Sequence, residues 1–390
     1  METFVDIATR SINKKGEELC GDHVEVIDRG DRIIAVLSDG LGSGVKANIL
    51  ATLTSKIAVT MLREGADIEE TVDTIMNTLP ECQVRKLAYS TFTILQVDRD
   101  LQTYIVEYDN PPVLVYRDGF ILPLEKTEKL VHGKTIHESR FKLKRGDMVS
   151  VVSDGAVHAG VGALLNLGWT WEEINLYLLE LNRVKKTADS IATDFLGVCN
   201  NLYGDQPGDD TTILTLKVRD KETVNLFTGP PRDPDRDPEL VRELLAAKGR
   251  KVICGGTSAN IVSRALGRTL DVQLDSMTPE VPPFARLEGF DLVTEGVLTL
   301  QKTLELIRLC REARFRDGED ILAREWNGST LLAHMLLEEC THLRMWVGRA
   351  VNPAHQSPDL PIDLHIKLRI IREIVRELQA LGKKVEVSYL

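Results

Sequence analysis

Four acidic residues stand where short apolar runs meet glycine or serine: Asp22 after Gly21, Asp39 and Asp154 each in a Ser-Asp-Gly triplet, and Asp209 after Gly208. One such pair alone is typical of a turn. Carboxylates gathered in one pocket repel each other and favour a bound cation, and hard oxygen ligands select Mg²⁺ or Mn²⁺. Two such ions about 3.5–4 Å apart can activate water for phosphoryl displacement. Convergence of the four residues would therefore make a two-metal hydrolytic site.

A strand and a helix are expected to hold Asp39. The apolar run at 33–37 ends in Ser38-Asp39, glycines follow at 40, 42 and 44, and apolar residues recur at helical spacing over 45–63. Glycine lets the backbone adopt tight turns and approach a ligand closely. The pattern predicts a carboxylate fixed at a strand end beside the start of a helix.

The remainder of residues 1–220 is predicted to be a layered α+β domain, because strands come first and last with helices between them. Consecutive β-rich runs on short connections favour antiparallel pairing. The expected strands are 4–8, 24–27, 91–97, 103–108, 113–116, 120–122, 148–152 and 211–216, and the further helices are 68–79, 171–181 and 188–202.

The order of these motifs resembles the metal-dependent protein serine/threonine phosphatases (PPM family), in their bacterial SpoIIE-like branch. The resemblance covers about residues 1–218 and implies an α-β-β-α sandwich with Mn²⁺ or Mg²⁺, two ions per site. It implies that Asp39 bridges the ions, that Asp22 and the Gly40 carbonyl complete one, and that Asp154 and Asp209 complete the other. Asp210 stands where the wider family often has asparagine. Three roles are open for it: metal ligand, hydrogen-bond acceptor next to the ligands, or turn residue.

Several other polar residues near these motifs keep two interpretations. Arg10, Lys14 and Lys15 are candidates for gripping phosphate or are solvated surface charges. Three histidines are candidate general acids for the leaving alkoxide or are structural. These histidines are His23, His132 and His137.

Residues 221–390 are predicted to form a smaller α/β domain with a mostly parallel sheet, since strands and helices alternate after the proline-rich segment 229–238. The strand, Gly-Gly turn and helix start at 251–260 and the polar loop at 347–356 lie where parallel sheets bind ligands. A plain tight turn is the alternative for 251–260. The hypothesis is a regulatory or ligand-binding domain for a small anionic metabolite.

Composition excludes several classes of protein. The net charge of −11 and the pI near 5.4 argue against nucleic-acid binding. Apolar runs are too short for a membrane span, the N-terminus lacks a signal-peptide pattern, and the six cysteines form no C-x-x-C pair. We expect a cytoplasmic protein.

The sequence thus predicts a protein serine/threonine phosphatase that uses a metal-activated water and forms no phosphoenzyme. By resemblance, its partner is a phosphorylated bacterial signalling protein similar to an anti-sigma antagonist. The alternative is a catalytically silent phosphatase fold that serves as a binding module, with residues 221–390 as the sensor of a small anion.

Overall fold

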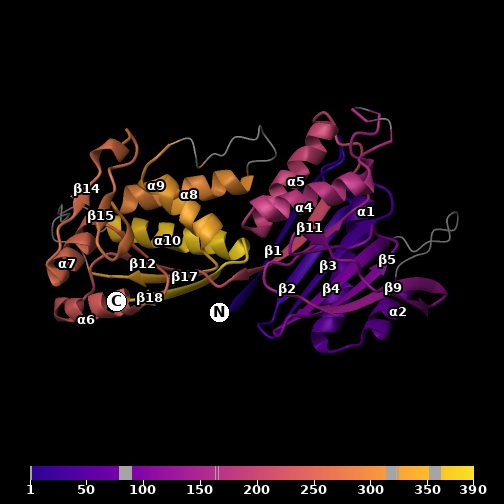
Figure 1. Cartoon of the computed structure of the whole chain (residues 1–390), viewed down its shortest axis with the longest axis horizontal. Helices are drawn as coiled ribbons and strands as arrows, with labels where there is room; N and C mark the ends of the chain where they lie inside the picture. Colours follow the sequence, from indigo (N-terminus) through magenta and orange to yellow (C-terminus); the bar gives the residue numbers. More distant parts are fainter. Residues whose placement is uncertain are drawn as a thin grey trace. The chain divides into compact units, whose positions relative to one another are not determined.

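The computed structural model of the chain describes residues 2–78, 90–162, 164–165, 167–312, 322, 325–350 and 362–390. Its backbone divides into two compact units (Figure 1). One consists of Val5–Arg219, and the other joins Met1–Phe4 to Asp220–Leu390. The two units are described separately below.

Two β-sheets form the middle of the first unit. The larger sheet is antiparallel and has the strand order β2-β3-β4-β5-β9-β8, and the smaller has the order β1-β11-β10-β6-β7. The strands of the larger sheet are β2 Asp22–Asp28, β3 Arg32–Gly40, β4 Ser90–Asp98, β5 Gln102–Tyr108, β8 Thr127–Val131 and β9 Lys134–Lys142. Those of the smaller are β1 Thr3–Ile12, β6 Leu114–Arg117, β7 Phe120–Ile121, β10 Met148–Val152 and β11 Thr211–Asp220.

The central strands bury consecutive residues, and because neighbouring side chains point to opposite faces, both faces of each sheet are buried. Leu37, Leu95 and Val151 belong to the core between the two sheets, whereas Val36 and Ile94 face the helices that cover the larger sheet. Those helices are α1 Gly44–Glu64 and α2 Ile68–Thr78. One short helix and two longer helices lie between β10 and β11 in the chain: α3 Gly155–His158, α4 Trp171–Val184 and α5 Ala188–Leu202.

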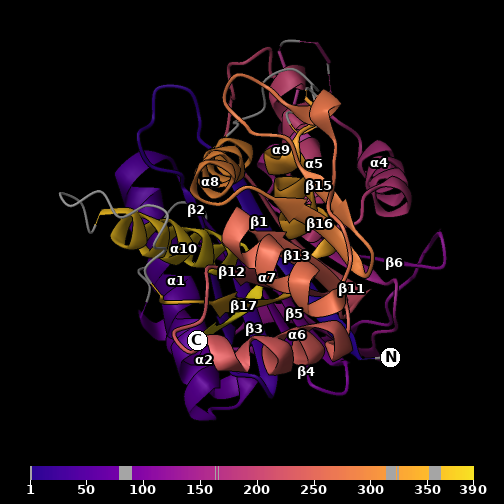
Figure 2. The same cartoon turned by 90° about the vertical axis from the view of Figure 1, so that its left-hand side faces the viewer.

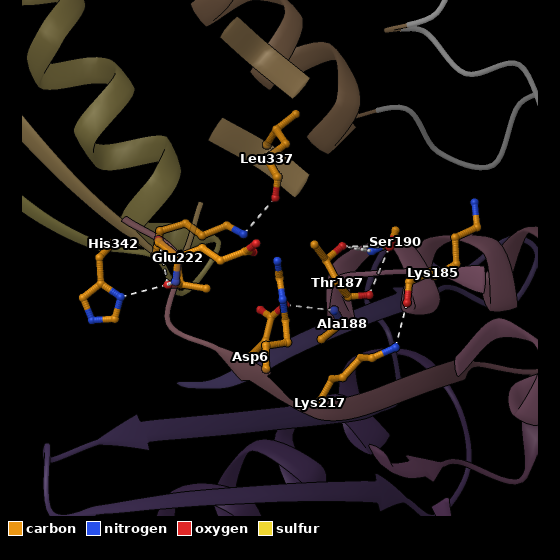
Figure 3. A network of polar contacts seen from close by, with 12 residues as sticks. Asp6, Lys185, Thr187, Ala188, Ser190, Lys217, Glu222, Leu337 and His342 are labelled. Atoms are coloured by element: carbon orange, nitrogen blue, oxygen red, sulfur yellow. Dashed lines mark hydrogen bonds and ion pairs between the residues drawn. The ribbon is translucent and has the colours of Figure 1, made fainter. Parts of the chain in front are cut away.

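Helix α4 covers the outer face of the smaller sheet, where Asn175 of α4 accepts a hydrogen bond from the buried Tyr116. At the edge strand β1, Asp6 accepts hydrogen bonds from the Ala188 amide, which begins α5, and from Arg219 (Figure 3). These contacts complete four layers. The predicted α-β-β-α sandwich is therefore confirmed.

Helix α1 is long and apolar enough to cross a membrane by length and composition, and it is the one described helix of that kind. Its face that includes Ala47, Leu50, Ala51, Ala58 and Leu62 is buried against the larger sheet. This packing is that of a core helix in a layered domain.

The second unit is built on a seven-stranded sheet with the order β14-β15-β16-β13-β12-β17-β18. Strands β16, β13, β12, β17 and β18 pair in parallel, and β14 and β15 add an antiparallel edge. The prediction of a mostly parallel sheet is confirmed. The strands are β12 Thr223–Thr228, β13 Arg250–Cys254, β14 Asp271–Val272, β15 Ala285–Leu287, β16 Phe290–Thr294, β17 His342–Val347 and β18 Lys384–Tyr389.

Helices cover both faces of this sheet. α6 and α7 pack with Phe227 and Ile253 on one face, and α8, α9 and α10 pack with Leu226 and Val252 on the other (Figures 1 and 2). The helices are α6 Asp237–Ala246, α7 Gly256–Leu266, α8 Val297–Glu312, α9 Gly328–His334 and α10 Ile362–Ala380, with short turns η1 Pro234–Arg236, η2 Leu274–Ser276 and η4 Met335–Glu339. The five parallel strands, numbered by their order along the chain, lie as 3-2-1-4-5, which is a doubly wound arrangement.

Candidate metal centre

The site begins at one end of the larger sheet, where β2 and β3 bring two carboxylates together. Asp22 and Asp39 are direct partners in the antiparallel register of these strands. The Gly40 amide donates to the Gly21 carbonyl at 3.1 Å, which extends the pairing past the strand ends. The pairing fixes two of the four predicted residues side by side.

The smaller sheet supplies Asp154, which follows strand β10. Its neighbour Ser153 is fully buried and donates a hydrogen bond to the Asp22 carboxylate at 2.7 Å, while the Thr212 amide donates to the Ser153 hydroxyl at 2.8 Å. Ser153 therefore links the end of β10 to both β2 and β11. This link explains why carboxylates from different sheets meet at one edge.

Two glycines let the neighbouring backbones come close. A Cβ atom on Gly40 would lie 2.1 Å from the Ala47 carbonyl oxygen in α1, and one on Gly155 would lie 2.1 Å from the Asp210 carbonyl oxygen. Real Cβ atoms do not approach carbonyl oxygens so closely. The glycine after each of Asp39 and Asp154 is therefore required by the packing of the site.

Electrostatic repulsion is strong among the assembled carboxylates. Burial, followed by the charges of Asp22, Asp154 and Asp209, raises the pKa of Asp39 to about 9. Burial also raises the pKa of Asp22 to about 7, and burial together with Asp154 raises the pKa of Asp209. Three carboxyl groups are thus driven toward protonation, and a bound cation would relieve the repulsion that drives them.

A histidine that the sequence analysis did not single out joins this group. Ligand atoms of Asp154, His158 and Asp209 all lie within 4.8 Å of one another. His158 is the last residue of the short helix α3 and follows Asp154 by one helical turn. The spacing of four residues was the available signal, but a helix of four residues has no periodicity that would have revealed it.

Asp210 and Lys14 also lie at this edge. The Lys14 amide donates to one Asp210 carboxylate oxygen at 2.9 Å, and the Lys14 ammonium lies 3.8 Å from Asp209. The other Asp210 carboxylate oxygen is buried and has no hydrogen-bond partner among the described residues. An unpaired buried carboxylate oxygen beside three repelled carboxyl groups fits a cation-binding site.

The remaining candidates have partners of their own. Arg10 donates to Asp189 in α5, and Lys15 donates to Gln206. His23 shares a hydrogen bond with Ser55, and burial lowers its pKa. The other two histidines pair with acidic groups on the outer layers, His132 with Asp73 and His137 with Glu128. Of the three candidate cations, Lys14 contacts both Asp209 and Asp210.

The donor set matches a hard divalent cation. It consists of carboxylate oxygens with one imidazole, which suits Mg²⁺ or Mn²⁺ and lacks the thiolates of a structural zinc site. The predicted metal residues therefore have the chemistry that the predicted ions need. The allocation of Asp22, Asp39, Gly40, Asp154 and Asp209 to particular ions stays a prediction.

Residues 29–219 match the family model described as stage II sporulation protein E (SpoIIE). The curated stage II sporulation protein E of Bacillus subtilis (strain 168) is 22% identical over 210 residues, which are 53% of this chain. The match covers 24% of that relative, so the chain spans about a quarter of its length.

Several solved structures are similar to part of this chain. The phosphatase domain of SpoIIE from Bacillus subtilis with a regulatory fragment has a TM-score of 0.47 and 19% identity, covering 56% of this chain and 64% of that one. The RsbU and RsbW domains of Rv1364c from Mycobacterium tuberculosis have a TM-score of 0.48 and 19% identity, covering 62% and 70%. The catalytic domain of the phosphatase PstP with two manganese ions has a TM-score of 0.39 and 14% identity, covering 56% and 100%.

Proposed function

The first domain of this chain belongs to the SpoIIE family, and we propose that the chain is a metal-dependent phosphatase of phosphoserine and phosphothreonine on a signalling protein. One observation carries the proposal: Asp22, Asp39, Asp154 and Asp209 converge from two sheets, and the pKa values of three of them are raised. Such repulsion is costly in a folded protein unless cations occupy the site.

In this proposal Asp39 would hold both ions, Asp22 and the Gly40 carbonyl would help to hold one, and Asp154 and Asp209 would help to hold the other. The ions would lower the pKa of a water and neutralise charge on the phosphoryl oxygens. Ser153 orients Asp22 through its hydrogen bond of 2.7 Å, which holds that carboxylate in one rotamer. Hydrolysis then needs no protein nucleophile and forms no phosphoenzyme.

Lys14 is proposed to contact the substrate phosphate. Its ammonium lies 3.8 Å from Asp209 and its side chain is more than a third exposed, so a phosphate at the site can replace Asp209 as the partner in this weak ion pair. Arg10 is a poorer candidate because it makes a bidentate pair with Asp189. Replacing Lys14 with methionine is therefore expected to raise KM with a smaller effect on kcat.

The activity is tested with p-nitrophenyl phosphate in Mn²⁺ or Mg²⁺. We expect Asp39→Asn to reduce kcat at least about 100-fold, because removal of a bridging carboxylate disturbs both ions. Asp73→Asn in α2, an exposed partner of His132, is the matched control and should retain activity. Hydrolysis by Asp39→Asn at the rate of the parent chain would refute the assigned site.

The competing proposal is a catalytically silent domain that only binds partners. Retention of all four carboxylates at one edge weighs against it. Calorimetric titration with Mn²⁺ separates the two proposals independently of substrate choice. A catalytic domain is expected to bind two ions, and a silent domain is expected to bind one or none.

The protein substrate is proposed to be a small phosphorylated switch protein, similar to an anti-sigma antagonist, in the bacterial cytoplasm. This proposal rests on the family of the first domain. A phosphoproteome comparison between cells with the parent chain and cells with Asp39→Asn is the test. The substrate should gain phosphoserine or phosphothreonine only in the variant.

Residues 221–390 are proposed to be a regulatory domain that binds a small anionic ligand. Support comes from the doubly wound order of its parallel strands, because such sheets bind ligands beyond the carboxyl ends of the strands. The loop at 347–356 was predicted to contribute, and its residues 351–356 lie outside the described part of the chain. Regulation predicts that the ligand changes kcat without binding at the metal centre.

A further inference from the structure

Two places in the second unit have the geometry of a ligand crevice. A crevice opens where neighbouring parallel strands send their helices to opposite faces of the sheet. Strands β12 and β17 do so through α6 and α10, and strands β13 and β16 do so through α7 and α8.

Between β12 and β17, backbone hydrogen bonds among the described residues fill the space where a crevice would open. The Gly348 amide after β17 donates to the Thr228 carbonyl at the end of β12 at 2.9 Å, and the Ala350 amide donates to the Pro230 carbonyl at 3.1 Å. A Cβ atom on Gly348 would lie 2.2 Å from the Pro230 carbonyl oxygen. Helix α6 also begins with Asp237 and Glu239, whose carboxylates would repel an anion at its N-terminus.

The second place is lined by glycine. Cys254 and Thr294 are register partners at the ends of β13 and β16, and Gly255 and Gly296 follow in the two loops. A Cβ atom on Gly296 would lie 3.5 Å from the Gly255 Cα, so the two loops approach each other with no side chain between them. A Cβ atom on Gly256 would have no neighbour within 4 Å, which leaves open space at the start of α7.

Helices α7 and α8 each carry a buried hydroxyl group at the equivalent position of the first turn. Ser258 and Thr299 stand three residues after Gly255 and Gly296, and both are 0% exposed. Neither hydroxyl has a hydrogen-bond partner among the described residues. The Ser258 oxygen lies 3.6 Å from the Cβ position of Gly255, so it faces the N-terminal end of α7. Buried hydroxyls without partners are rare, and a ligand would satisfy them.

The charge around the two helix ends differs. The Glu295 carboxylate accepts a hydrogen bond from the Gly296 amide and so occupies the N-terminus of α8. Helix α7 has no acidic residue in its first turn. Its first amides point out of the helix end, where an oxyanion is favoured by hydrogen bonding and by the helix dipole.

We propose that the loops at 255–258 and 295–299 bind the phosphate group of a small phosphorylated molecule. The first-turn amides of α7 and the hydroxyls of Ser258 and Thr299 are the donors. A phosphate group suits this set because its oxygens accept hydrogen bonds from several directions at once. The proposal rests on the ligand-binding function proposed above for residues 221–390 and places the binding site at the starts of α7 and α8.

Inorganic phosphate is the probe, titrated calorimetrically into the full chain in the presence of EDTA so that no divalent ion links phosphate to the first domain. We expect Ser258→Ala and Thr299→Val each to weaken phosphate binding about tenfold, the equivalent of one hydrogen bond to a charged group. Glu295→Gln should tighten binding, because it removes a negative charge beside the crevice. Equal affinity in the parent chain and all three variants, or no phosphate binding by the parent chain, would overturn the proposal.

Thr303→Val is the matched control on α8. The Thr303 hydroxyl is buried one turn further along the helix and already donates to the Thr299 carbonyl at 2.8 Å. Its loss should lower the unfolding temperature and leave phosphate affinity unchanged. Ser258→Ala should do the opposite, lowering affinity while the unfolding temperature of the unliganded chain stays equal or rises, because an unpaired buried hydroxyl is removed. Equal losses of affinity in Thr303→Val and Ser258→Ala would show a general effect of stability and refute the site.

Binding and regulation are measured separately. The phosphate titration tests the crevice and requires no catalytic activity. Hydrolysis by Ser258→Ala with and without a phosphorylated metabolite tests the regulatory role. A chain that binds phosphate here without a change in kcat retains the site and refutes the regulation.

Discussion

At the scale of single residues, Asp39 and Asp22 make the stability of the ion-free chain depend on pH. Their carboxyl groups have raised pKa values in the folded chain, about 9 and about 7, so the folded state binds protons that the unfolded state releases near pH 4. The resulting stabilisation is fully present below about pH 4 and is lost as the pH rises through 7 toward 9.

We therefore expect the chain in EDTA to unfold at lower urea concentration at pH 8.5 than at pH 6, as measured by circular dichroism. Mn²⁺ should restore stability at the higher pH, since it binds the folded state with its carboxylates ionised. The double variant Asp22→Asn with Asp39→Asn should lose most of this difference. If the double variant shows a difference of the same size, the pH dependence of stability comes from other titratable groups.

His158 leads to a prediction about metal preference. Imidazole suits transition metals better than Mg²⁺, and a ring nitrogen of His158 lies within 4.8 Å of carboxylate oxygens of Asp154 and Asp209. His158→Ala should weaken Mn²⁺ binding about tenfold and leave Mg²⁺ binding less affected. Calorimetric titrations of both ions measure this ratio, with His137→Ala on β9 as the control. An unchanged ratio would place His158 outside the coordination shell.

The sequence revealed some of these residues and hid others for a physical reason. Asp39 and Asp154 were visible because each ends an apolar strand beside a glycine that packing demands. His158 was missed because α3 is too short to show a helical period. Ser258 and Thr299 resemble ordinary buried helix residues in the sequence, and only the tertiary structure shows that they lack partners.

At the scale of elements, the contacts of Gly40 with α1 and of Gly155 with the loop before β11 hold the site together. Gly40→Ala and Gly155→Ala should each destabilise the chain by at least about 2 kcal/mol, because a methyl group cannot fit against the opposing carbonyl oxygen. Gly208→Ala is the control, since its Cβ would meet the Tyr203 ring at an ordinary 3.4 Å. Urea unfolding provides the comparison, and equal midpoints for all three variants would contradict the packing argument.

Helix α4 has a capping box that positions it over the smaller sheet. The Thr170 hydroxyl accepts from the Glu173 amide, and the Glu173 carboxylate accepts from the Thr170 amide. Thr170→Ala should lower the free energy of unfolding by about 1 kcal/mol. Glu180→Ala on the exposed face of α4 should change it much less, and a larger loss there would point to surface charge as the stabilising feature.

Helices were easier to predict than short strands. The expected helix at 188–202 coincides with α5, because its apolar spacing and the Thr187 cap agree. Strand β8 was not anticipated, since its residues are mostly exposed and alternate weakly, and β14 has only two exposed residues. Such strands exist because a neighbouring strand offers hydrogen bonds, which no local pattern records.

At the scale of the whole molecule, the first residues of the chain belong to the second unit. The Lys221 amide donates to the Glu2 carbonyl at 2.9 Å, and the Phe4 ring packs edge-on against the His342 ring with centroids 5.5 Å apart. Phe4→Ala should cost about 3 kcal/mol and should increase hydrogen exchange in β17. Leu130→Ala on β8 is an exposed control, and unchanged exchange in β17 of Phe4→Ala would show that Phe4 stabilises the first unit alone.

The alternation of strands and helices predicted the parallel sheet of the second unit, but not its strand order. That order depends on which face each crossover takes, and this is decided by long-range packing such as that of α8 and α10 on Leu226. The sandwich of the first unit was easier to predict, because the resemblance to a known family implied that two sheets pack together.

The placement of residues 2–4 also affects the order in which contacts can form during synthesis. Residues 2–4 are synthesised more than two hundred residues before their partners Lys221 and His342. The first unit can therefore fold before residues 2–4 have made their contacts with Lys221 and His342. The second unit acquires these contacts only after His342 has been synthesised, so a domain that follows the first unit in the chain is completed by residues that precede that unit.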